Sequence, residues 1–154
     1  MTQTPARSRS RSAARLAAVQ ALYQQEMEKT PLPTLLHEFH HHRLGATIED
    51  VEYADAEVDF FDDVVSGVHA RSAELDGLIE AKLAADWSLH RLDKPMRQIL
   101  RAGAYELVAR IDVPTASVIS EYVDVAHAFY DKREAAFVNG LLDAVAKEVR
   151  RIPS

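Results

Sequence analysis

The apolar residues of this chain recur at helical spacing over most of its length, and this periodicity constrains the fold more than any other feature. In the clearest case, five residues occupy positions i, i+3, i+4, i+7 and i+11: Met96, Ile99, Leu100, Gly103 and Leu107. This spacing puts them on one face of an α-helix. Strand-like alternation competes nowhere over more than a few residues. The sequence therefore predicts an all-α protein.

Breaks in the pattern predict six or seven helices. A first helix runs from Ser12 to about Glu28, because this segment lacks Gly and Pro and is rich in alanine. Two prolines end it, and a short second helix covers residues 34–42. A central helical region breaks near Ser72 or Gly77. The remaining helices start at Asp93 with Pro95, at Pro114, and before Val138.

We expect these helices to pack as two small bundles within one domain over residues 12–150. Residues 1–11 precede them and are rich in Arg, Ser and Thr without an apolar anchor, so we expect a flexible arm. If the first helix reaches back into this arm, Arg7, Arg11 and Arg15 form one stripe away from the Val19 and Tyr23 face.

Charge is unevenly distributed. The 154 residues carry 18 basic and 24 acidic side chains, a formal charge of −6, yet residues 1–25 hold four arginines and no acid. These arginines are Arg7, Arg9, Arg11 and Arg15. A nearby phosphate would feel this local charge more than the distant acidic body, because salt screens charges beyond about 8–10 Å. The arm therefore indicates nucleic-acid binding, with a solvated tail as the alternative.

Composition excludes several classes of protein. Without cysteine, the chain cannot hold iron–sulfur clusters, thiol nucleophiles or disulfides, and a reducing compartment is favoured. No apolar stretch approaches the length of a membrane span, and the basic N-terminus lacks the apolar core of a secretory signal. We therefore expect a cytoplasmic protein with no membrane partner.

One short motif suggests catalysis. The segment from His37 to His41 fits the HExxH pattern, in which two histidines one turn apart bind zinc around a general-base glutamate, Glu38. A third ligand is missing, since Ile48 stands where the extended motif requires histidine. The pattern also arises easily within a histidine-rich run. We expect no enzyme, no cofactor, no catalytic residue and no dedicated metal site, and we keep a zinc hydrolase only as an alternative.

Five segments in the same order resemble the NusB family of bacterial transcription antitermination factors. The segments are RLAAVQALY from Arg15, LDGLI from Leu75, Trp87 with Arg91-Leu92-Asp93, LRAGAYEL from Leu100, and FVNGLLD from Phe137. Val113-Pro114 also precedes a helix as in that family. The resemblance covers most of residues 7–145.

The resemblance implies an all-helical fold and an arginine-rich motif that contacts boxA RNA of ribosomal RNA leader transcripts. It also implies pairing with NusE, a small-subunit ribosomal protein, and entry of the pair into the elongating RNA polymerase complex to promote read-through. Arg7, Arg9, Arg11 and Arg15 would supply charge-assisted contacts to RNA. Gln20 lies further along the same helix, and we expect Tyr23 to be core. A homodimer of the free protein stays open.

Other positions lie toward the RNA or NusE side in the family. Ser120-Glu121 and Ala126-His127 depart from its usual residues. We carry over Glu121, Phe137 and Asn139 as RNA-binding candidates, although Phe137 could instead be core and Asn139-Gly140 could serve close helix packing. Lys132 and Arg133 could extend the basic RNA-binding surface. For Trp87 we expect core or helix-end packing rather than a site.

Two further alternatives remain. The fold also resembles the RNA-recruiting module of ribosomal RNA cytosine methyltransferases, which would demand a separate catalytic partner. A helical scaffold that binds only protein is the other alternative.

Overall fold

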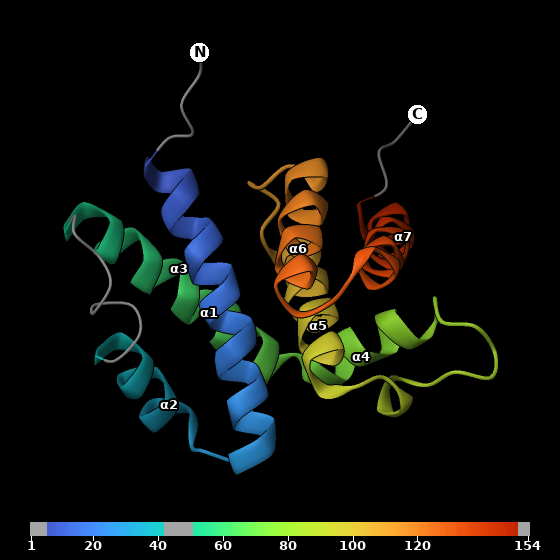
Figure 1. The fold of residues 1–154 in the computed structure, drawn as a ribbon, viewed down its shortest axis with the longest axis horizontal. Helices are drawn as coiled ribbons and strands as arrows, with labels where there is room; N and C mark the ends of the chain where they lie inside the picture. Colours follow the sequence, from blue (N-terminus) through green and yellow to red (C-terminus); the bar gives the residue numbers. More distant parts are fainter. Residues whose placement is uncertain (1–5, 42–50, 151–154) are drawn as a thin grey trace. The chain divides into compact units, whose positions relative to one another are not determined.

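The computed structural model describes the backbone of residues 6–41 and 51–150, and the side chains of residues 10–41 and 58–150. Within these ranges it is all-helical, as predicted, with no strand. The elements are α1 (Ala6–Glu28), α2 (Leu32–Phe39), α3 (Val51–Ala70), α4 (Ser72–Glu80), a 3-10 turn η2 (Leu89–Arg91), α5 (Lys94–Ala109), α6 (Thr115–Phe129) and α7 (Lys132–Val149) (Figure 1).

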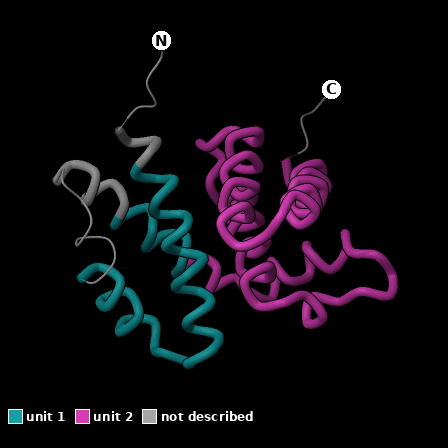
Figure 2. The backbone as a smooth tube through the Cα atoms, viewed as in Figure 1, with its two compact units in different colours: residues 1–66 teal, residues 67–154 magenta. Residues whose placement is uncertain are grey.

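The chain divides into two compact units. Unit 1 comprises residues 1–66 and unit 2 comprises residues 67–154, so the boundary falls inside α3 (Figure 2). No helix in the described part of the chain combines the length and apolar character that crossing a bilayer requires.

In unit 1, α1 begins at Ala6, earlier than the predicted Ser12. Nothing between Ala6 and Ser12 interrupts a helix, because this stretch contains only Ala, Arg and Ser. Ser10 therefore lies within the helix as a buried residue. The predicted end at Glu28 is confirmed, and Lys29 follows in the left-handed region with φ of 56°.

The core of unit 1 joins the three helices. Ala14, Ala18 and Val19 of α1 are fully buried. Phe39 of α2 stacks on Phe61 of α3 with ring centroids 5.4 Å apart. Such offset aromatic pairs add stability beyond the area that they bury.

Unit 2 packs its later helices closely. The predicted apolar face of α5 is confirmed, since its five residues are all buried. A Cβ on Gly103 would lie 2.7 Å from Leu142 Cδ1, so the glycine lets α7 approach α5. Glu106, fully buried on α5, accepts a hydrogen bond of 2.5 Å from the Tyr122 hydroxyl on α6. A buried carboxylate requires such donors.

The predicted boundaries in unit 2 are confirmed at three places. Helix α3 ends at Ala70 and α4 starts at Ser72. Asp93 is the N-cap position of α5, with a proline in its first turn. Pro114 directly precedes α6.

Candidate nucleic-acid interface

The arginines of α1 differ in their surroundings. Arg15 is only 4% exposed, and its guanidinium carbon lies 4.8 Å from the centroid of the Phe60 ring on α3. Arg11 is half-buried and lies 4.7 Å from the same centroid. A guanidinium at this distance is attracted by the aromatic face. Arg15 and Arg11 therefore hold α1 against α3 within unit 1.

This placement corrects the expected arginine stripe. Arg15 lies four residues before the fully buried Val19, so helical geometry puts it on the apolar face and not away from it. Its stem packs in the core and its charge is accommodated by Phe60. Arg15 is therefore a buried structural residue in this structure rather than an exposed cation.

The remaining N-terminal candidates have more exposed positions or lie outside the described side chains. The backbones of Arg7 and Arg9 belong to the first turns of α1, one turn or less before Arg11, but their side chains are outside the described residues. Gln20 is half-buried. Tyr23, expected in the core, is 38% exposed, because it lies near the end of α1 beyond the buried Leu22.

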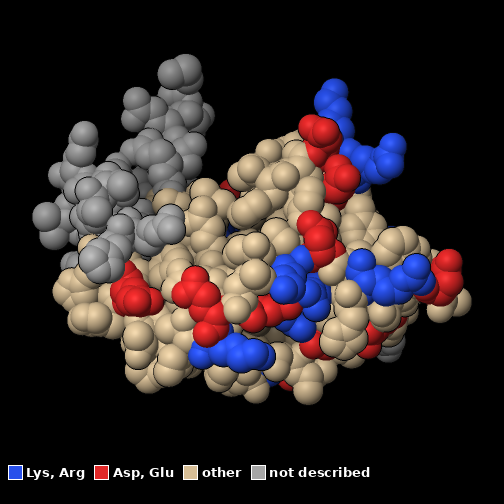
Figure 3. Space-filling model, turned by 60° about the horizontal axis from the view of Figure 1, so that its bottom comes forward, with Lys and Arg blue, Asp and Glu red and all other residues tan. Residues whose placement is uncertain are grey.

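The described charges are mixed on one face of the molecule. On the face drawn in Figure 3, the visible Lys and Arg side chains are interspersed with Asp and Glu. Because opposite charges at this spacing cancel at a distance, the face presents no broad cationic field.

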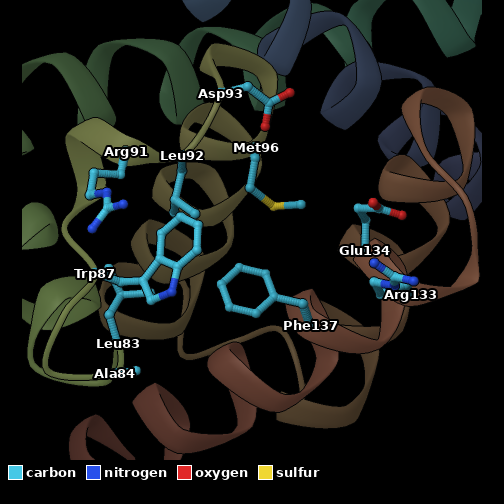
Figure 4. A pocket seen from close by; sticks show the side chains of 10 residues that line it. All are labelled: Leu83, Ala84, Trp87, Arg91, Leu92, Asp93, Met96, Arg133, Glu134 and Phe137. Atoms are coloured by element: carbon cyan, nitrogen blue, oxygen red, sulfur yellow. The ribbon is translucent and has the colours of Figure 1, made fainter.

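Unit 2 contains a cavity of about 490 Å³ that sequence reasoning missed. Its apolar lining comprises Leu83, Ala84, Trp87, Leu92, Met96 and Phe137. Figure 4 shows the Trp87 and Phe137 rings lying next to each other in this hollow, with Met96 and Leu92 close by. Four charged residues also line it: Arg91, Asp93, Arg133 and Glu134. The cavity thus has an apolar floor and a rim of two basic and two acidic side chains.

The expected place of Trp87 in the core is wrong. Trp87 is 46% exposed, because it lies in the irregular segment between α4 and η2 rather than on a helix face. The Arg91 guanidinium carbon lies 5.0 Å from the Trp87 ring centroid. Phe137 is likewise on the surface, with 37% exposure. The signal available in the sequence for this surface was Trp87 in a segment between helices, followed four residues later by Arg91.

One hydrogen bond holds the charged rim at Asp93. The Tyr130 hydroxyl donates to Asp93, and this bond joins the residue after α6 to the start of α5. Burial and the bond to Asp93 raise the pKa of Tyr130. Asp131, Lys132, Arg133 and Glu134 line a shallow hollow at the start of α7, two acids beside two bases.

The other predicted residues of unit 2 lie on α6 and α7. Asn139 is exposed and lines a groove with Thr115, Ser120 and Asp143. Glu121 is half-buried on α6. The predicted residues thus form one group on α1 in unit 1 and a second group on α6 and α7 in unit 2.

The histidine-rich segment gives no support to the zinc-hydrolase alternative. His40 Nε2 lies 2.6 Å from Asp62 Oδ1, and Glu38 accepts a hydrogen bond of 3.3 Å from Gln24. Glu38 is therefore engaged with α1 instead of facing a metal-bound water. Among the described residues, no three His, Asp or Glu side chains are grouped to hold a metal ion.

The fold and these surfaces define an all-helical protein with arginines on its first helix and an apolar cavity in its second unit. Residues 12–147 match the model of the NusB family, so the chain belongs to the NusB family.

Relatives that match most of the chain belong to the same family. The chain is 69% identical over 150 residues to the transcription antitermination protein NusB of Novosphingobium aromaticivorans, covering 97% of this chain and all of the relative. It is 66% identical to NusB of Sphingopyxis alaskensis, covering 94% of this chain and 97% of the relative. A solved structure of antitermination factors NusB and NusE with dsRNA is 26% identical, with a TM-score of 0.75, covering 91% of this chain and 98% of that one.

Proposed function

We propose that this protein promotes transcription antitermination by binding boxA RNA of ribosomal RNA leader transcripts together with NusE. The pair then joins the elongating RNA polymerase complex in the cytoplasm. The observation that carries the proposal is the 69% identity to a NusB antitermination protein over nearly the whole chain. The likeness to a NusB that was solved with NusE and RNA supports both partners.

For RNA, we propose that Arg7, Arg9 and Arg11 contact the phosphates and bases. Arg15 has a different role: buried against Phe60, it fixes α1 so that the preceding turns present their arginines. Arginine suits contact with RNA because its planar guanidinium both pairs with phosphate and stacks on bases. Gln20 follows along the same helix as a polar contact.

For NusE, we propose the Trp87–Phe137 cavity of unit 2. Exposed aromatic rings in a hollow with a polar rim are typical of the anchoring points of protein interfaces. The rim pairs Arg91 and Arg133 with Asp93 and Glu134, and this balance suits a protein surface better than a polyanion. Phe137 and Arg133, carried over as RNA candidates, are therefore assigned to the protein side.

The remaining candidates extend these surfaces. Lys132 is exposed at the start of α7, beside the cavity rim residue Arg133. Glu121 and Asn139 lie on α6 and α7, where a partner that covers the cavity can reach further along α7. We propose them as secondary contacts.

The RNA assignment is tested by measuring binding of a boxA oligonucleotide and a scrambled control, each with and without NusE. Arg7→Ala/Arg9→Ala/Arg11→Ala should weaken binding and flatten the dependence of log K on log salt by about 0.7 for each phosphate that the variant no longer neutralises. Sequence-independent binding, or an unchanged salt slope in the triple variant, would reject the arm as the boxA contact.

The NusE assignment is tested separately with Trp87→Ala, measured by calorimetry against purified NusE. This variant should lose at least about tenfold in NusE affinity, as expected for an interface hot spot, while RNA binding by the chain alone is kept. Ile111→Ala is a matched control, because Ile111 is the most exposed large apolar residue described and lies outside the cavity. Equal NusE affinity of Trp87→Ala and wild type contradicts this docking site.

A further inference from the structure

The histidine-rich segment contains one pair that neither proposed surface uses. His37 lies in the last turn of α2, and helical backbone continues through His41, four residues later. Both side chains are exposed. Residues at i and i+4 project from the same face of a helix, so the two imidazoles are neighbours. Their ring centroids lie 4.3 Å apart, with ring planes inclined by 59°.

This separation is close to what a shared metal ion requires. Bond lengths to imidazole nitrogen of about 2.0–2.1 Å put each ring centroid roughly 3.2 Å from the ion. At a right angle between the two bonds, as in tetragonal or octahedral complexes, the centroids would lie about 4.5 Å apart. The observed centroid separation of 4.3 Å is close to this value.

The neighbouring groups leave this pair available. His40 points to Asp62 on α3, at 2.6 Å, and Glu38 accepts a hydrogen bond from Gln24 on α1. These contacts fix the inward side of α2 against both other helices of unit 1. The His37 and His41 rings contact each other and form no hydrogen bond to another described residue. Their ring nitrogens thus face no competing partner among the described side chains.

We propose that His37 and His41 form a two-histidine site for one divalent first-row transition ion. The two imidazole nitrogens occupy adjacent positions of the coordination sphere, and water fills the others. Affinity follows the general order of these metals, so Cu²⁺ binds more tightly than Ni²⁺ or Zn²⁺. Because the ion joins two successive turns, its binding stabilises the end of α2. The site is independent of the RNA and NusE surfaces.

The test uses the full chain without an affinity tag, titrated with Cu²⁺ and with Zn²⁺ in calorimetry. His37→Ala and His41→Ala should each lower the affinity for Cu²⁺ at least about tenfold, since loss of a ligand costs no less than loss of its supporting partner. Electron paramagnetic resonance of the Cu²⁺ complex should report two nitrogen ligands in wild type and one in either variant. Both positions are exposed, and circular dichroism verifies that the fold is retained.

Two controls make the result specific. His40→Ala removes a histidine of the same helix that faces Asp62, and His90→Ala removes an exposed histidine of unit 2. Both should keep wild-type Cu²⁺ affinity. The proposal is overturned if His37→Ala and His41→Ala bind as wild type does, or if either control loses as much affinity as they do. A wild-type spectrum with a single nitrogen also overturns it.

Discussion

The guanidinium of Arg150 donates a hydrogen bond of 2.8 Å to the backbone carbonyl of Leu107. The same group donates to the carbonyls of Glu106, Arg110 and Val113 at 2.7–3.1 Å. The last carbonyls of a helix have no partner within it, and arginine satisfies them here at the end of α5. One side chain after α7 thus fixes the end of α5 and the connection to α6.

Arg150→Ala should therefore lower the free energy of unfolding by about 2 kcal/mol, since hydrogen bonds from a charged group are each worth more than neutral ones. Arg150→Lys should recover little, because one ammonium cannot reach carbonyls spread over this fork. Urea unfolding followed by circular dichroism measures both. An alanine variant within about 0.5 kcal/mol of wild type, the range of ordinary surface changes, would contradict the role.

Replacing Gly67 and Gly77 by alanine distinguishes the effect of close packing on stability from the effect of helix propensity. A Cβ on Gly67 would lie 2.2 Å from the Tyr105 ring, whereas a Cβ on Gly77 meets nothing within 4 Å. Gly67→Ala should cost about 1–3 kcal/mol through overpacking. Gly77→Ala, within α4, should instead stabilise by up to about 1 kcal/mol. Thermal unfolding of both variants checks these opposite signs, and the same sign for both would refute the packing argument.

The raised pKa of Tyr130 predicts that the protein loses stability at alkaline pH. Burial and the hydrogen bond to Asp93 raise this pKa above the ordinary value of 10.0. A group whose pKa is raised on folding contributes stability that is complete below its unfolded pKa and is lost as pH rises above it. Stability should therefore fall above about pH 10. Tyr130→Phe should reduce this fall in denaturant titrations at pH 8–11, and an equal fall in both proteins would argue against the assignment.

Arg15 should behave as a core residue and not as an RNA contact. Arg15→Ala should lower the free energy of unfolding by about 2 kcal/mol, because the variant lacks both the desolvated guanidinium over the aromatic ring and the packed stem. Arg91→Ala is the matched control: its guanidinium also covers an aromatic ring, Trp87, but is exposed, so the cost should stay below about 1 kcal/mol.

The salt dependence of RNA binding tests the same assignment of Arg15 independently of stability. Under conditions where Arg15→Ala is folded, its salt slope for boxA RNA should equal that of wild type, since a buried guanidinium releases no counterions from the RNA. A flattened slope would show that Arg15 reaches the RNA and would reverse its assignment.

The sequence by itself determined the helices of this protein and most of their ends. Periodic apolar residues, Asp93 with Pro95, and Pro114 act within a few residues along the chain, and such local signals do not depend on what packs nearby. The ordered segments from Arg15 to Asp143 also indicated the family, because a family resemblance is carried by residue order.

Only the tertiary structure decided which side chains face partners. Arg15 reads as a cation in the sequence, but Phe60, far along the chain, buries it. Trp87 reads as core or helix-end packing, but it is 46% exposed, and Phe137 of α7 lies beside it in one cavity. Burial is set by contacts between residues distant in sequence, so charge and apolar character alone could not distinguish an anchor from a binding surface.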